Sequence, residues 1–302
     1  MRNTLIAIIC MSSFLYAQNT DLSTGTSKIA NSSAKMTSDG NKHTSNYYNN
    51  IGVRKVKQNS DDQGAIEDFK KALEINPDCK VCLTNMGRSL LRLKRYDDAI
   101  KTFRQVIKTT PAFVEAYASL GEALTNKGLF KESLAPYRIA LKLNPKDPLI
   151  LTNYAISLHH LGEYQLAVKM LDESIKIKPD LAESHSNRGV ALYKLGQHSK
   201  ALKSLKKADE LNPNQSRIQN NLGVVYDRMG KRKKARNYYK KAVEIDPGFI
   251  FAQYNLASNY AETGKRNEAY AQLKVLQKMD YDLARNLRKQ LWKKHILNVP
   301  KE

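Results

Sequence analysis

Residues 216–249 read SRIQNNLGVVYDRMGKRKKARNYYKKAVEIDPGF, and this stretch decides the fold. It holds two apolar stripes at helical spacing, the first ending at Gly230 and the second at Pro247. The stripes are formed by Leu222, Tyr226 and Met229, and by Ala235, Tyr239 and Ala242. The pattern predicts two helices joined by a turn. Small Gly223 and Ala235 indicate where the two helices approach closely, because a bulky side chain there would push them apart.

The same unit recurs along the chain with a period of 34 residues. Three residue types keep this period, and a small residue fills each gap in the alanine and glycine series. The prolines are Pro77, Pro111, Pro145, Pro179, Pro213 and Pro247. The alanine series is Ala99, Ser133, Ala167, Ala201, Ala235 and Ala269, and the glycine series is Gly87, Gly121, Ala155, Gly189, Gly223 and Ala257. A shared period of this length predicts an all-α repeat protein.

These residues resemble the tetratricopeptide repeat (TPR) family, whose units carry small residues and a proline at these places. The resemblance implies a right-handed solenoid of helix-turn-helix repeats over residues 46–281, followed by a capping helix and tail at 282–302. The seven predicted units are 46–79, 80–113, 114–147, 148–181, 182–215, 216–249 and 250–281. In the first unit the spacing from Gly52 to Ala65 is one residue longer than in later units, which predicts an insertion in the turn between its helices. Leu283, Leu287 and Leu291 are expected to pack on the last unit.

The N-terminal end reads as an export signal followed by a linker. Arg2 precedes an apolar run that ends at Ala17, so residues 1–17 are expected to be a cleaved signal peptide and 18–45 a disordered tether rich in Ser, Thr and Asn. Lipidation at Cys10 and an uncleaved anchor are the alternatives. The expected location is the periplasm or cell envelope, with secretion as the other outcome.

One polar series follows the first helix of each unit. It consists of Asn85, Asn153, Asn187, Asn221 and Asn255, with Ser119 in the gap and Asn50 at its start. An asparagine amide both donates and accepts hydrogen bonds, which suits the backbone of an extended peptide. The series resembles the asparagine ladder of the TPR superhelix in O-linked N-acetylglucosamine transferases. The alternative is that asparagine is simply usual at this position in the family.

The resemblance also places charged and aromatic residues on the same predicted peptide-binding groove. The basic ones are Arg88, Arg92, Arg217 and Arg228. Phe251 and Tyr254 lie one helical turn apart on the last unit, where they would either receive an apolar side chain of the partner or contact the closing helix.

A strong positive charge accompanies the repeat. The 302 residues carry a formal net charge of +21, which suggests acidic partners or an anionic surface. A basic patch follows the turn of the sixth unit, at Lys231, Arg232, Lys233, Lys234, Lys240 and Lys241. It would dock an anionic envelope surface or an acidic protein, or it is a solvated helix face. No nucleic-acid partner is expected, because no nucleic-acid-binding motif accompanies the run.

Catalytic chemistry finds little support in the sequence. Cys79 and Cys82 lie at the junction of the first two units, where a disulfide, free thiols and a redox pair are the alternatives. His159 and His160 are expected to be surface histidines, since neighbouring helical side chains diverge and do not share a metal. We expect no metal, no cofactor and no enzyme activity.

The chain is therefore expected to be a binding scaffold or adaptor that takes an extended segment of a partner protein in its groove. Two alternatives are a surface-binding protein that uses the basic patch for anionic lipid or glycan, and a non-catalytic subunit of an envelope enzyme assembly. The sequence names no partner and sets no oligomeric state.

Overall fold

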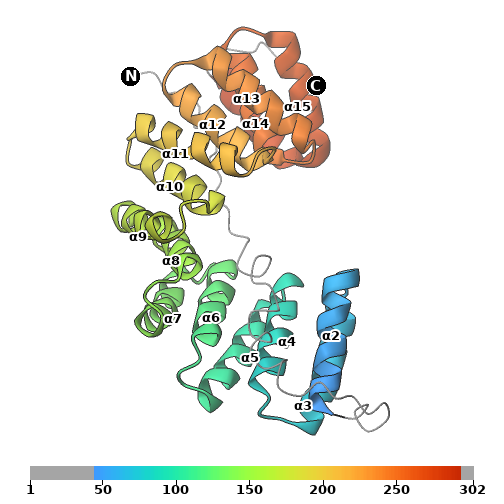
Figure 1. The fold of residues 1–302 in the computed structure, drawn as a ribbon. Coiled ribbons are helices and arrows are strands. Elements are labelled where there is room, and N and C mark those ends of the chain that lie inside the picture. Colours follow the sequence, from blue (N-terminus) through green and yellow to red (C-terminus); the bar gives the residue numbers. More distant parts are fainter. Residues whose placement is uncertain (1–43, 294–302) are drawn as a thin grey trace. The chain divides into compact units, whose positions relative to one another are not determined.

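The structure is a computed structural model that describes residues 44–293. Within this range every regular element is an α-helix, and the helices follow one another as hairpins (Figure 1). The all-α TPR solenoid class expected from the repeat pattern is confirmed. The predicted signal peptide, most of the tether and the C-terminal tail lie outside the described residues.

The described chain divides into two compact units, with the division between residues 163 and 164. The N-terminal unit contains α2 (Ser45–Asn59), α3 (Asp62–Ile75), α4 (Lys80–Arg92), α5 (Tyr96–Thr109), α6 (Val114–Asn126), α7 (Phe130–Leu143) and α8 (Pro148–His160). The C-terminal unit contains α9 (Tyr164–Ile177), α10 (Ala182–Lys194), α11 (His198–Leu211), α12 (Ser216–Arg228), α13 (Arg232–Ile245), α14 (Ile250–Glu262), α15 (Arg266–Met279) and α16 (Tyr281–Lys293). The division falls inside the predicted unit 148–181, so α8 belongs to the first compact unit and α9 to the second.

Each hairpin closes where a small residue of its first helix meets a large side chain of its second. A Cβ atom added at Gly223 would lie 2.5 Å from Cε1 of Tyr239 and 3.2 Å from the carbonyl oxygen of Ala235. The equivalent glycines, Gly52, Gly87, Gly121 and Gly189, face Phe69, Phe103, Tyr137 and Leu205 in the same way. Contact at this distance leaves no room for a side chain, which is the physical basis of the small-residue period.

The turn after α12 shows how the first stripe ends. Gly230 adopts a φ of 75°, a left-handed conformation that glycine reaches without steric cost. Its N–H donates to the carbonyl of Asp227, and the N–H of Lys231 donates to the carbonyl of Tyr226. These bonds satisfy the last carbonyls of α12 and start α13 immediately after the turn.

The first hairpin differs from the expectation of a longer turn. Its two helices are separated by Ser60 and Asp61 alone, whereas three residues separate α4 from α5. The extra residue is instead absorbed by α2, which has 15 residues against 13 in α4. Ser60 ends α2 in a left-handed conformation, with φ 52°, and Asp61 caps α3 by accepting from the N–H of Gly64. The extra residue is therefore present, but the prediction that it lies in the turn is wrong, because it lies in α2.

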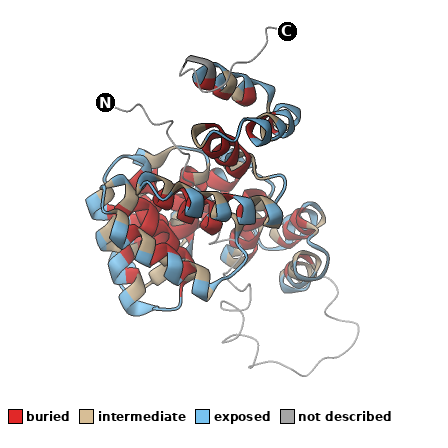
Figure 2. Ribbon diagram, turned by 90° about the horizontal axis from the view of Figure 1, so that it is seen from above, coloured by how far each residue is buried: buried red, intermediate tan, exposed pale blue. Residues whose placement is uncertain are grey.

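The core runs along the interior of the stacked hairpins in each unit, and exposed residues lie on the outer sides of the second helices (Figure 2). In the C-terminal unit, α16 closes the last hairpin by contacting α14 and α15. Leu287 and Leu291 are completely buried in the cluster that contains Leu256, Leu273 and Leu276, and Leu283 packs against its edge.

Candidate peptide-binding surface

The first helices of the N-terminal unit, α2, α4, α6 and α8, contact one another in sequence order. We call the side on which they meet the inner face. Asn85 of α4 lies there with 5% of its surface exposed, and its Nδ2 donates to Oδ1 of Asn49 in α2 at 3.0 Å. Asn50, which sequence spacing placed at the start of the asparagine series, is exposed instead. The residue of α2 that bonds to Asn85 is thus Asn49, one position before the predicted Asn50.

The same pairing recurs in the C-terminal unit, where Nδ2 of Asn255 donates to Oδ1 of Asn220 at 2.8 Å. Asn49 and Asn220 occupy equivalent places in their repeats, each one residue before the predicted series. Sequence reasoning missed both as partners, although two asparagines at the same repeat position were a visible signal. Part of the asparagine series therefore joins adjacent repeats to each other.

All five predicted asparagines are buried. Asn153 of α8 exposes 7% of its surface and Asn255 of α14 exposes 1%, while Asn187 and Asn221 expose none. That they hold a peptide backbone stays a prediction, since each of the two hydrogen bonds above uses one donor of a group that can make several.

Two polar groups on the inner face of the N-terminal unit stand out. Arg88 lies one turn after Asn85 on α4, exposes 9% of its surface, and its Nε has no hydrogen-bond partner. Ser119, the member of the series on α6, is fully buried, and its Oγ also has no hydrogen-bond partner. Buried polar groups in folded proteins are nearly always paired, so these two groups are exceptions.

Arg92 does not have the free guanidinium that its predicted role requires. Its Nε and Nη2 donate to the carboxylate of Asp62 at 2.8 and 2.6 Å, and Nη2 also donates to Ser89. Asp62 is the first residue of α3, so the pair joins the first two repeats. The prediction that Arg92 selects the charge of a partner is wrong, because the bidentate pair already satisfies it.

The remaining predicted groove residues lie in the C-terminal unit. Arg217 and Arg228 are exposed. Phe251 is 40% exposed and makes an edge contact with Phe249. Tyr254 is 6% exposed, and its hydroxyl donates to Gln290 of α16 at 3.5 Å. Burial raises the pKa of Tyr254 above its ordinary value. For Tyr254 the structure therefore supports the second alternative, contact with the closing helix.

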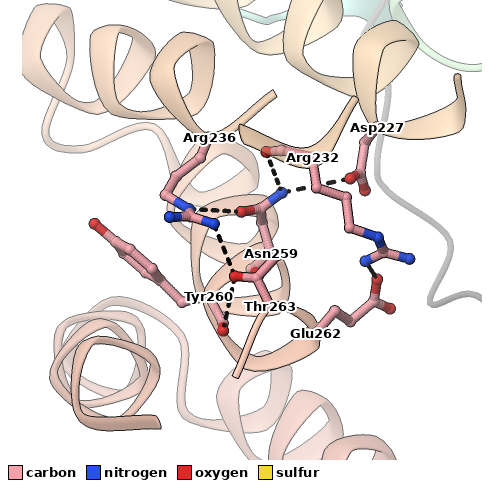
Figure 3. Close-up of polar contacts among 7 residues, drawn as sticks. All are labelled: Asp227, Arg232, Arg236, Asn259, Tyr260, Glu262 and Thr263. Atoms are coloured by element: carbon pink, nitrogen blue, oxygen red, sulfur yellow. Dashed lines mark hydrogen bonds and ion pairs between the residues drawn. The ribbon is translucent and has the colours of Figure 1, made fainter. Parts of the chain in front are cut away.

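One predicted residue of the basic patch, Arg232, takes part in a polar network between the last two repeats, which Figure 3 shows. Arg232 at the start of α13 pairs with Glu262 at the end of α14. The five lysines of the patch, in contrast, are exposed. Arg232 was predicted as a member of the basic patch, but its ion pair with Glu262 places it at a junction between repeats.

Four further side chains complete the network (Figure 3). Arg236 donates to Oδ1 of Asn259 at 3.0 Å and to Oγ1 of Thr263 at 2.9 Å. Asn259 in turn donates to the carboxylate of Asp227 at 3.4 Å. Burial raises the pKa of Asp227 above its ordinary value, while nearby Arg232 opposes that shift and Glu262 adds to it. Sequence reasoning missed Arg236 and Asn259, which come together only when α13 and α14 pack.

The cysteines and histidines have defined surroundings. Cys79 and Cys82 form a disulfide at the N-terminus of α4, where Cys79 is the N-cap residue and Cys82 is buried. His159 is 8% exposed, so the expectation of a surface histidine is wrong there. His160 is exposed and stacks on Phe130 with the ring centres 4.2 Å apart. Burial lowers the pKa of His160.

Between residues 44 and 293, no group of three or more His, Cys, Asp and Glu side chains is placed to hold a metal ion. In the same range, no helix combines the length and the apolar character needed to cross a membrane.

Comparisons with known proteins agree on the fold. Helical hairpins stacked in this way define the class of α-helical solenoid repeat proteins. Five family models, described as tetratricopeptide repeat or TPR repeat, match residues 46–79, 84–148, 137–169, 157–196 and 180–247. The chain belongs to the tetratricopeptide repeat family. None of the curated proteins matches it.

Three solved structures illustrate the likeness. A tetratricopeptide repeat protein from Parabacteroides merdae is 16% identical with a TM-score of 0.67, over 82% of this chain and 98% of that one. Pseudomonas aeruginosa pilF is 17% identical with a TM-score of 0.60, over 70% and 97%. The APC/C hetero-tetramer Cut9–Hcn1 is 18% identical with a TM-score of 0.68, over 73% of this chain but 44% of the other. This chain thus spans less than half of that last relative, and such identities show the fold alone. The fold is consistent with a scaffold for protein–protein interaction.

Proposed function

We propose that the protein is a non-catalytic scaffold that binds an extended segment of a partner protein along the inner face of its first helices. The observation that carries this proposal is the pair of buried, unpaired polar groups there, Nε of Arg88 and Oγ of Ser119. Leaving a buried donor unpaired costs about 1–3 kcal/mol, and a charged one more. A carbonyl or carboxylate of a bound segment would supply the missing acceptor of Arg88, which keeps 9% of its surface exposed.

The donors on the inner face also suit a peptide. Arg88 and Asn85 lie three residues apart and so point from the same side of α4. Ser119 holds the place of Asn85 in the next repeat. An extended peptide offers carbonyl oxygens at regular intervals, so successive repeats would each contact one part of its backbone.

A panel of random 12-residue peptides displayed on phage would test this function directly. Peptides selected on the full-length protein should bind Arg88→Gln about ten- to a hundredfold more weakly, the loss expected for one hydrogen bond to a charged group. Arg104→Gln is the matched control, because Arg104 is exposed on the second helix α5. It should bind the peptides unchanged.

Thermal unfolding of both variants separates loss of binding from loss of fold. Equal binding by Arg88→Gln and the wild type, with Arg88→Gln still folded, would contradict the inner face as the peptide site. Failure to select any peptide would do so as well.

We further propose that the protein is exported, on the strength of the signal-like residues 1–17. N-terminal sequencing of the protein recovered from its native cells should then begin at Gln18. A chain that still begins at Met1 and lies in the cytoplasm would contradict export.

A further inference from the structure

The outer surface of the C-terminal unit concentrates positive charge on two second helices, α11 and α13. We call it the lysine face. On α13 and the turn before it the exposed lysines are Lys231, Lys233, Lys234, Lys240 and Lys241. On α11 they are Lys200, Lys203, Lys206 and Lys207.

Both helices border one buried cluster. Leu202 of α11 and Tyr238 of α13 pack against it. The buried stripes, which contain Ala201 and Leu205 on α11 and Ala235 and Tyr239 on α13, turn inward. The lysines therefore point away from the core. A helix of 14 residues is about 20 Å long, so the charged area is broad in relation to a single side-chain contact.

Few carboxylates offset this charge. The acidic residues of the two helices are Asp209, Glu210 and Glu244. Among the described contacts of the nine lysines, the one ion pair is Lys207 with Glu210, at 3.2 Å. Asp209 accepts a hydrogen bond from Gln219. The net charge of the lysine face is therefore strongly positive.

The kind of cation left on the surface indicates the kind of partner. The arginines of α13, Arg232 and Arg236, are directed into the network between repeats (Figure 3). The exposed cations of α11 and α13 are therefore all lysines. An arginine fork recognises one carboxylate or phosphate with fixed geometry, whereas lysine is a hydrated point charge on a flexible stem. Many lysines spread over two helices fit a continuous anionic surface better than a single acidic side chain.

The lysine face also lacks an apolar anchor. The exposed large apolar residues described in the C-terminal unit are Leu166, Ile177, Phe251, Val275 and Tyr281, and all lie on other helices. A surface held by lysines alone binds by attraction to headgroups and does not insert into the hydrocarbon.

We infer that the lysine face docks the protein on the headgroups of an anionic phospholipid bilayer. Its residues lie on second helices, whereas the proposed peptide site lies on first helices of the N-terminal unit. Lipid docking therefore does not depend on the proposed peptide binding, and each can fail separately.

Co-sedimentation with vesicles tests the inference. The full-length protein is mixed with vesicles of phosphatidylcholine alone or with added phosphatidylglycerol, at low and high NaCl. We expect binding to the anionic vesicles only, with a loss of at least about a hundredfold in affinity as salt screens the charges. The variant Lys233→Glu, Lys234→Glu, Lys240→Glu, Lys241→Glu should lose at least as much at low salt.

A matched control carries the same change of net charge on the N-terminal unit. It replaces the exposed Lys101, Lys108, Lys142 and Lys146 by Glu. Circular dichroism melts confirm that both variants fold. Equal loss in the control would attribute binding to overall charge and overturn the inference. Binding to pure phosphatidylcholine, or to soluble polyglutamate in place of anionic vesicles, would also overturn it.

Discussion

At the scale of single residues, the closest approach within each hairpin depends on which large side chain lies opposite the small one. Wherever the second helix carries an aromatic ring, at Phe69, Phe103, Tyr137 and Tyr239, the first helix carries glycine. Alanine appears at this place only in repeats whose second helix carries leucine, as with Ala257 and Leu273. The ring fills the space that a Cβ atom would need, so the two positions depend on each other.

Gly223→Ala should therefore destabilise the protein by about 1–3 kcal/mol, the usual effect of overpacking. Adding Tyr239→Leu should recover part of this loss, because the double variant copies the combination of Ala257 and Leu273. Urea unfolding of the two single variants and the double variant gives the coupling between the sites. Additive effects would mean that the ring and the glycine do not constrain each other.

The network of Figure 3 makes a second prediction, about pH. The pKa of Asp227 is raised in the folded protein above its ordinary value of 3.8, chiefly by burial. Folding then favours the protonated acid, and the ionised form lowers stability as pH rises through the unfolded and then the folded pKa. Asp227→Asn should thus be more stable than the wild type at pH 7, and this difference should vanish as pH falls below 3.8.

Thermal unfolding of the two proteins between pH 3 and pH 7 would measure this. Glu244→Gln, an exposed change on α13, controls for the loss of one negative charge. If Asp227→Asn were less stable at pH 7, the attraction between Asp227 and Arg232 would outweigh the burial of the carboxylate.

At the scale of helices, the same position joins adjacent repeats at three junctions by different chemistry. The first residue of a second helix meets a residue near the end of the next repeat's first helix. In the pair Asp62–Arg92 the second helix supplies the acid, and in the pair Arg232–Glu262 it supplies the base. Phe130 and His160 form a ring stack at the same position. Reversed polarity at equivalent junctions disfavours pairing between the wrong repeats, because like charges would then meet.

A third prediction concerns the contribution of the closing helix α16 to stability. Leu287 is fully buried against the last hairpin, so Leu287→Ala should cost about 2–5 kcal/mol, from lost burial and the cavity left behind. Tyr281→Ala on the same helix removes a side chain that is 60% exposed and should change stability by no more than about 0.5 kcal/mol. Urea unfolding compares the two. Similar small effects would show that α16 does not contribute to the core.

At the scale of the whole molecule, charge and structure are divided between the helix sets. At two junctions the charged groups form ion pairs, Asp62 with Arg92 and Arg232 with Glu262, and so add nothing to the net charge of +21. In the C-terminal unit it gathers on the outer lysines of α11 and α13. First helices supply buried polar groups and second helices supply exposed cations, so the two kinds of polar group lie on different helices of each repeat.

The amino-acid sequence by itself determined the repeat: the period of 34, the helix pairs, the small residues and the position of the closing helix. These follow from local spacing, because helical periodicity and turn residues act over a few positions. Tertiary structure alone decided which polar groups are free. Arg92 and Asp62 are 30 residues apart, as are Arg232 and Glu262, and each pair meets only when hairpins stack. The partner of Asn85, the burial of His159 and the unpaired Arg88 were hidden for the same reason, since hydrogen bonding between repeats depends on the side chains that packing brings together.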